Sequence, residues 1–113
     1  MNQQHQIILS IGSNQGNRKD YLMQCIDMLH LNLGTVVGVS SIYESESWGF
    51  ESDSFYNCIV LVHSHKKINQ IFKSIQKIET KLGRFRSGQN GYQPRTIDID
   101  IIYFDSEIIA TEA

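Results

Sequence analysis

The sequence predicts an α+β fold in which an antiparallel sheet carries two helices on one face. Three observations predict it. Short β-type segments occur before and after two amphipathic segments, each amphipathic segment is followed by a glycine, and 113 residues with 41% hydrophobic content suit one core rather than two. We therefore expect a single domain over residues 1–113 with one site.

The first elements follow from a short apolar run and a long amphipathic one. Residues 7–11 predict a strand, and residues 12–17 predict a polar turn whose asparagines can cap a helix. The helix is expected to begin near Arg18 and to end at Gly34 in a left-handed conformation. Five residues share its apolar face at helical spacing: Leu22, Cys25, Ile26, Leu29 and Leu33.

The second half of the chain repeats this alternation. Strands are expected at residues 36–43 and 58–62, the latter extending to residue 65. The long polar loop between them is typical of a segment that binds a ligand or moves. A second amphipathic helix over residues 68–82 ends at Gly83. Residues 97–104 predict a strong strand, followed by a turn and a weaker extended segment at residues 107–109. The order β-α-β-β-α-β is that of a ferredoxin-like sandwich, which leaves one face of the sheet for a site.

Composition excludes several classes of partner. Twelve Asp and Glu against ten Lys and Arg give a net charge of −2, so there is no basic field for nucleic acid. No run approaches the roughly 20 apolar residues of a membrane span, and the N-terminus does not resemble a secretion signal. We expect a cytoplasmic protein in which Cys25 and Cys58 are reduced core thiols.

The segment Pro94-Arg95-Thr96-Ile97-Asp98-Ile99-Asp100-Ile101 carries the chemistry. Alternate side chains of a strand share a face, so Asp98 and Asp100 are expected on the open face and the isoleucines on the helix face. Two neighbouring carboxylates repel unless a cation joins them, and magnesium prefers oxygen ligands. The alternative is a solvated outer face whose charges merely alternate with core residues.

Cations lie next to this pair in the sequence. Arg84, Arg86 and Arg95 surround the loop before the strand, and arginine forks match phosphate oxygens. Carboxylates for metals beside arginines for phosphates are typical of phosphoryl transfer. Gln76 and Glu79, one turn apart near the end of the second helix, can hydrogen bond a ligand; alternatively, Glu79 is a solvated acid paired with a nearby lysine.

These segments together resemble the 6-hydroxymethyl-7,8-dihydropterin pyrophosphokinases of folate biosynthesis. The resemblance spans nearly the whole chain, in the order of the family, and rests on the motif at residues 94–100 and on five further segments: Gly12-Ser13-Asn14-Gln15-Gly16-Asn17-Arg18, Ser41-Ile42-Tyr43-Glu44, Trp48-Gly49, Phe55-Tyr56-Asn57 and Ile78-Glu79-x-x-Leu82-Gly83-Arg84. It implies transfer of pyrophosphate from ATP to the pterin hydroxymethyl oxygen, with release of AMP and use of two magnesium ions.

The resemblance also implies roles for single residues. Asp98 and Asp100 match the metal ligands, and Arg84 and Arg95 match the catalytic, charge-stabilising arginines. ATP is expected to contact Gln76, Glu79, Arg86, Arg95 and the backbone of Ile101. The pterin is expected to contact Ser45, Glu46, Ser47, Trp48, Phe55, Asn57 and Tyr92, with the loop over residues 86–93 closing as a lid.

Two other readings stay open at this level. Family members continue beyond residue 113 with further ATP contacts, so the chain could be a remnant that binds pterin or nucleotide without chemistry. It could also be a ferredoxin-like binding module, although an RNA-binding sheet would need aromatic residues on its central strands and a basic surface. We expect ATP and pterin as small-molecule partners of a monomer or weak dimer.

Overall fold

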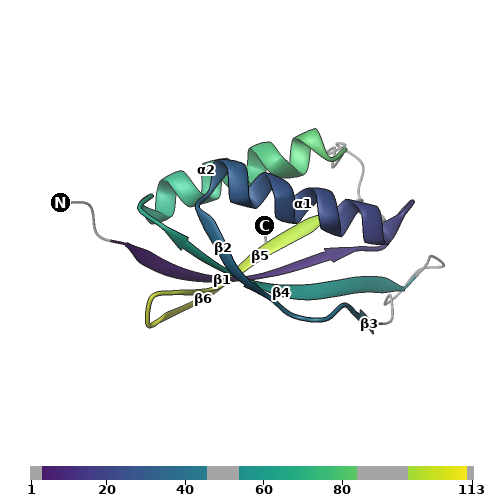
Figure 1. Ribbon diagram of the computed structural model, residues 1–113, viewed down its shortest axis with the longest axis horizontal. Helices are drawn as coiled ribbons and strands as arrows, with labels where there is room; N and C mark the ends of the chain where they lie inside the picture. The colour runs from purple at the N-terminus through teal and green to yellow at the C-terminus, as the bar shows by residue number, and fades with distance from the viewer. Residues whose placement is uncertain (1–3, 46–53, 84–96, 112–113) are drawn as a thin grey trace.

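The computed structural model describes residues 4–45, 54–83 and 97–111. Within them, two helices and six strands follow one another along the chain (Figure 1): β1 (His5–Ser13), α1 (Arg18–Asn32), β2 (Thr35–Val39), β3 (Tyr43–Ser45), β4 (Phe55–Ser64), α2 (Ile68–Lys81), β5 (Asp98–Phe104) and β6 (Glu107–Thr111).

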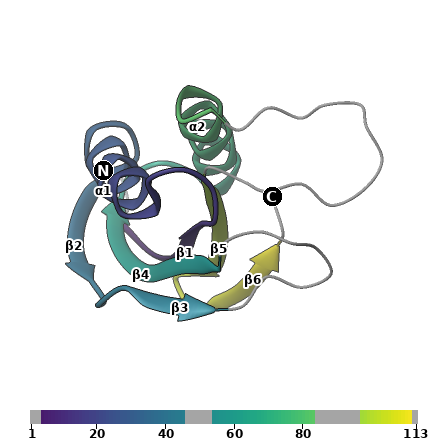
Figure 2. The same ribbon diagram turned by 90° about the vertical axis from the view of Figure 1, so that its right-hand side faces the viewer.

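The strands form one antiparallel sheet in the order β2-β4-β1-β5-β6, with β3 also paired with β4. Figure 2, an end view, shows both helices over one side of the curved sheet. This is the predicted α+β, ferredoxin-like arrangement, and it is confirmed. In the part of the chain that the structure describes, no helix is long and apolar enough to cross a membrane.

The core lies between the helices and the sheet. Alternate residues of the central strands point into it, and the apolar faces of both helices cover them. The buried strand residues include Ile7, Leu9 and Ile11 of β1, Cys58, Val60 and Val62 of β4, and Ile99 and Ile101 of β5. The predicted alternation in β5 is therefore confirmed: Ile99 and Ile101 face the helices, and Asp98 and Asp100 lie on the other face.

The expected single strand over residues 36–43 is wrong, because the chain leaves the sheet between β2 and β3. Ser40 marks the break. Its backbone N–H donates to the carbonyl of Ile59 at 2.8 Å, and its hydroxyl accepts the N–H of Ile59, also at 2.8 Å. A side-chain oxygen thus accepts a hydrogen bond that a strand would give to a backbone carbonyl. A register shift between Val36 and Gly38 precedes this break.

The first turn is shorter than predicted, because β1 continues through Gly12 and Ser13. The helix cap inside it is confirmed. Asn17 is the N-cap of α1, and its side-chain oxygen accepts the N–H of Asp20 at 3.2 Å. Of the six residues that were expected in the turn, Gly12 and Ser13 end β1, Asn17 caps α1, and residues 14–16 connect them.

The two glycines that follow the helices differ. Gly83 adopts the expected left-handed conformation, with φ of 95°. Gly34 does not have a positive φ, so the expectation of a left-handed cap there is wrong. The reason for a glycine is space: a Cβ at Gly34 would lie 2.2 Å from the carbonyl oxygen of His63 and 2.9 Å from Cα of Ser64. Beside it, the Ser64 hydroxyl donates to the carbonyl of Leu33 at 2.6 Å.

Candidate functional site

Most of the described residues that were predicted to act lie at one end of the molecule. The ends of β1, β3 and α2 meet the starts of α1, β4 and β5 there, at the right of Figure 1. Strand ends are places where side chains from several strands converge without disturbing the core. The sheet face away from the helices carries the polar groups at this end.

Asp98 and Asp100 lie on that face, and the register fixes what is beside them. Asp98 is opposite Gly12 of β1, and Asp100 is opposite Ser10. On the other side of β1, Gly12 is opposite Asn57 of β4. Two strand spacings of about 4.8 Å therefore separate the Asp98 backbone from that of Asn57. Asp98, Gly12 and Asn57 thus form a row across three strands, and because the middle residue is a glycine, no side chain lies between the other two.

Asn57 is held by neighbouring groups of β3 and β4. Its side-chain amide donates to the hydroxyl of Ser45 at 2.8 Å, and it lies 3.4 Å from the carbonyl of Tyr43 and 3.5 Å from that of Phe55. Phe55 is opposite Ser45 in the register. The structure thus brings together three of the residues predicted to contact the pterin, namely Ser45, Phe55 and Asn57.

Gly12 lies directly beside this cluster. A Cβ at this position would be 2.8 Å from the Oδ1 atom of Asn57 and 3.4 Å from the Cδ1 atom of Phe55. Contacts below 3 Å between carbon and oxygen are strongly repulsive, so a larger residue would displace the carboxamide. The absence of a side chain at Gly12 therefore allows Asn57 its observed position.

Glu79 of α2 contacts the β5 backbone between Asp98 and Asp100 from the helix side of the sheet. Its Oε2 atom accepts the backbone N–H of Ile99, the residue between Asp98 and Asp100, at 3.1 Å. The side chain is only 3% exposed, so the alternative of a solvated Glu79 is wrong. Glu79 therefore anchors the β5 backbone between the two aspartates.

The cysteines lie in the same core, close to Glu79. Both are buried and free, as predicted. Burial is the main cause that raises the pKa of the Cys25 thiol, and the charges of Cys58 and Glu79 add to it. Burial likewise raises the pKa of Cys58. Both thiols therefore stay protonated near neutral pH and act as small apolar core residues.

Arg18, at the start of α1, joins the beginning of β4 to the helix. Its Nη1 atom donates to the carbonyl oxygen of Ser54 at 2.8 Å and to the Ser54 hydroxyl at 3.2 Å. Its guanidinium lies 3.9 Å from the ring centroid of Tyr56, a cation–π contact. The Ser54 hydroxyl in turn donates to the carboxylate of Glu44. These contacts hold the chain on both sides of Phe55.

Replacing Arg18 with methionine is expected to lower the free energy of unfolding by about 1–3 kcal/mol, because it removes charged hydrogen bonds and the contact with Tyr56. Urea denaturation followed by circular dichroism measures this. The control is Lys19→Met at the next position, whose side chain is exposed. Equal stability of the two variants would contradict the role of Arg18.

The remaining predicted site residues divide into two groups. Gln76 is exposed on α2, and Ile101 pairs with Leu9 of β1 and Thr111 of β6, so their expected ATP contacts stay predictions. Seven others lie outside the described residues: Glu46, Ser47, Trp48, Arg84, Arg86, Tyr92 and Arg95.

Sequence reasoning missed four residues at this end. Gly12 was read as part of a structural turn, although the resemblance already included its motif. Ser10 faces Asp100 only through the register, and Arg18 meets Ser54 across a separation of 36 residues. Nothing local in the sequence predicts such pairs.

Comparison with known families supports the resemblance. A family model described as 7,8-dihydro-6-hydroxymethylpterin-pyrophosphokinase matches residues 8–112. This range covers both helices and all the described strands except the first three residues of β1.

Individual relatives agree with it. The chain is 41% identical over 98 residues to the 2-amino-4-hydroxy-6-hydroxymethyldihydropteridine pyrophosphokinase of Porphyromonas gingivalis, which covers 85% of this chain and 67% of the relative. It is 40% identical over 106 residues to the protein of the same name from Bacillus subtilis, which covers 92% and 62%. It is also 36% identical over 107 residues to the folic acid synthesis protein FOL1 of Dictyostelium discoideum, covering 94% of this chain and 16% of the relative. The chain thus spans about two thirds of the length of the bacterial relatives.

Proposed function

The chain belongs to the 7,8-dihydro-6-hydroxymethylpterin-pyrophosphokinase family, and we propose from this that it transfers pyrophosphate from ATP to 6-hydroxymethyl-7,8-dihydropterin in folate biosynthesis. The observation that best supports this is the row of residues from Asp98 across Gly12 to Asn57. In this row the carboxylates proposed to bind cations and phosphates, Asp98 and Asp100, lie two strands from Asn57, whose carboxamide is proposed to bind the polar edge of the pterin ring.

The pterin lies, in this proposal, over the start of β4. The Phe55 ring contacts the face of the pterin, and the Asn57 carboxamide hydrogen bonds its edge. Ser45 fixes the orientation of Asn57 by accepting its amide at 2.8 Å. A ring held over Gly12 would have its hydroxymethyl group directed along the row toward Asp98. The backbone at residues 45–48 and the side chain of Tyr92 are proposed to complete the pterin site on the resemblance alone.

Whether this site suits magnesium depends on which side chains can supply oxygen ligands. Magnesium in phosphate-transferring sites is held by one or two carboxylates, with the remaining ligands supplied by water and substrate phosphates. Asp98 and Asp100 provide two carboxylates on one strand face, and no group of three or more metal-binding side chains occurs among the residues described. The donor set therefore suits magnesium ions shared with ATP, whose contribution is to neutralise phosphate charge.

The protein's own residues position the reactants. Glu79 holds the backbone between Asp98 and Asp100, which keeps the carboxylates directed away from the core. Arg84 and Arg95 are proposed to stabilise charge on the transferred group. The proposed ATP contacts are Gln76, Glu79, Arg86, Arg95 and the backbone of Ile101. These roles follow from the resemblance. The attacking hydroxyl forms a bond to the β-phosphorus of ATP while the bond from that phosphorus to the AMP oxygen breaks.

The other properties proposed here are a cytoplasmic location and a monomeric or weakly dimeric state without a nucleic acid partner. Buried free thiols at Cys25 and Cys58 support a reducing compartment.

Pterin-dependent formation of AMP tests the proposed reaction. With ATP and magnesium, AMP is expected to accumulate when 6-hydroxymethyl-7,8-dihydropterin is present. It is not expected with the 6-methyl analogue, which lacks the acceptor hydroxyl. Equal AMP formation with both compounds would indicate hydrolysis of ATP instead.

Gly12→Ala is expected to weaken pterin binding about tenfold while leaving stability within about 1 kcal/mol, since the new Cβ would displace the carboxamide of Asn57 rather than backbone atoms. Fluorescence titration with the pterin gives the Kd, and thermal denaturation gives the stability. An unchanged Kd would contradict the placement of the pterin beside Asn57.

A further inference from the structure

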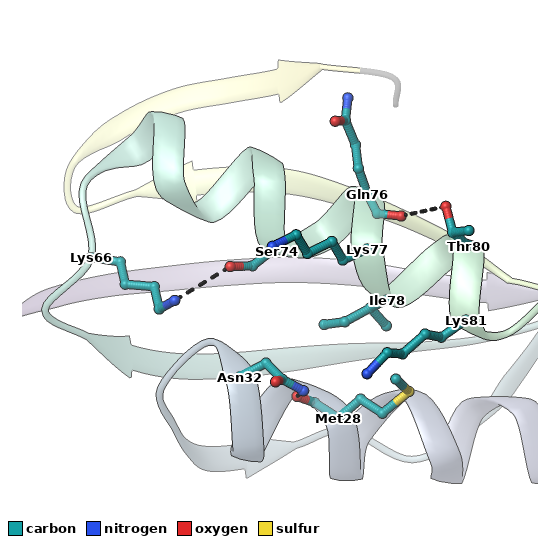
Figure 3. Close-up of a pocket in the computed structure, with 9 residues that line it drawn as sticks. All are labelled: Met28, Asn32, Lys66, Ser74, Gln76, Lys77, Ile78, Thr80 and Lys81. Atoms are coloured by element: carbon teal, nitrogen blue, oxygen red, sulfur yellow. Dashed lines mark hydrogen bonds between the residues drawn. The ribbon is translucent and has the colours of Figure 1, made fainter.

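A groove between the two helices lies on the side of the sheet away from the proposed catalytic face. It has a volume of about 420 Å³. Met28 and Asn32 of α1 form one wall, and Ser74, Ile78 and the side chains around them on α2 form the other (Figure 3). The side chains of Asp98 and Asp100 lie on the face of β5 that points away from the helices, so a ligand in this groove would not contact the carboxylate pair.

Three lysines direct their side chains to this groove. Lys66 comes from the segment before α2, and its Nζ atom lies 3.5 Å from the hydroxyl of Ser74. Figure 3 shows Lys77 running along α2 beside Ser74 and Lys81 reaching from the end of α2 toward Met28. Two of these cations are one helical turn apart, and the third comes from the other end of the helix.

No ion pair of these lysines is found among the described residues. The described residues that line the groove include no carboxylate, although Lys81 also lines a neighbouring pocket together with Asp20. Within the three described ranges, the one ion pair joins His5 to Asp105 and involves none of these lysines. Three ammonium groups beside one groove are therefore a local basic patch on a chain whose net charge is −2.

The groove also offers a neutral donor. Thr80 of α2 donates its hydroxyl hydrogen to the carbonyl of Gln76 at 2.9 Å, as is usual for such residues in helices. No such bond to the helix backbone is found for Ser74 in the described part of the chain, where its oxygen is the acceptor for Lys66. Its hydrogen can thus be donated to a ligand.

We propose that this groove between α1 and α2 binds a small anion with several phosphate groups, held by Lys66, Lys77 and Lys81 and by the hydroxyl of Ser74. Polyvalent phosphate matches the groove because several ammonium groups can contact separate oxygens of one ligand. Gln76, which is proposed to contact ATP, also lines the groove, but Figure 3 shows its side chain directed away from the three lysines. Binding in the groove uses neither Asp98 nor Asp100, and it does not depend on the proposed reaction.

Titration with inorganic tripolyphosphate in EDTA, followed by ¹H–¹⁵N NMR, tests the proposal. Saturable shifts are expected at the amides of Lys66, Ser74 and Lys77. The Kd is expected to rise about tenfold or more in the variant carrying Lys66→Gln, Lys77→Gln and Lys81→Gln, since each ammonium contributes a factor of a few. The matched control carries Lys19→Gln, Lys67→Gln and Lys73→Gln, three exposed lysines outside the groove.

The control variant is expected to bind with an unchanged Kd at the groove amides. Equal weakening in both triple variants would show attraction by net charge and overturn the site. The absence of saturable shifts at the groove, including the case in which shifts occur only near Gly12 and Asn57, would overturn it as well.

Discussion

Replacing Asp98 with asparagine is expected to reduce kcat about 1,000-fold or more, because asparagine keeps the shape of the side chain and removes one of two carboxylates for the magnesium-bound phosphates. Pterin affinity is expected to stay nearly unchanged, since two strand spacings separate Asp98 from Asn57. Steady-state rates of AMP formation and fluorescence titration with the pterin measure the two effects separately.

The control for this substitution is Asp27→Asn. Asp27 is exposed on α1, in the helical layer, and its replacement removes the same charge from the protein. Its rate is expected to equal that of the unsubstituted chain. If the Asp98→Asn protein kept normal turnover while correctly folded, the assignment of the carboxylate pair to the phosphate site would be wrong.

Gly34→Ala is expected to lower the free energy of unfolding by about 3 kcal/mol, and Tm by about 10 °C or more. The added Cβ would lie 2.2 Å from the carbonyl oxygen of His63 and 2.9 Å from Cα of Ser64. Both are backbone atoms of β4, the strand between β2 and β1, so they cannot move without disturbing the sheet. Thermal and urea denaturation give the size of the loss.

Gly38→Ala is the matched control, because it introduces the same methyl group four residues further along the chain, within β2. There the nearest contact of the added Cβ is 3.7 Å, to the Cβ atom of Leu61, which is an ordinary van der Waals distance. Its stability is expected to change by less than about 1 kcal/mol. Comparable losses in the two variants would refute the close approach of Gly34 to β4 as the cause.

The fold could be predicted from the sequence because local patterns and tertiary packing agree. The apolar face of α1, with Leu22, Cys25 and Leu29, is buried as its spacing predicts. The alternation of isoleucine and aspartate in β5 likewise decides which side chains face the helices. Each of these patterns repeats over several residues, so a single substitution does not obscure it.

The errors fall where one long-range contact overrides the local pattern. Residues 36–43 have strand propensity throughout, but the Ser40 hydroxyl accepts a bond from β4 and the strand divides there. A glycine after a helix usually indicates a left-handed cap. At Gly34 the reason is different: the backbone of Ser64 lies so close that a side chain would not fit.

The candidate site shows the same division. The spacing predicts the pair of Asp98 and Asp100, and the resemblance predicts Asn57 and Phe55. The residues next to them could not be predicted in these positions, because Gly12, Arg18 and the buried Glu79 contact residues distant in the sequence. Register, which pairs Asp98 with Gly12 and Gly12 with Asn57, is set by the assembled sheet.

Mass spectrometry of the pterin product is the most direct test of the proposed reaction. Incubation of this chain with ATP, magnesium and 6-hydroxymethyl-7,8-dihydropterin is expected to give the pterin diphosphate and AMP in equal amounts. A pterin monophosphate with ADP, or an unmodified pterin under conditions in which both substrates bind, would contradict the account.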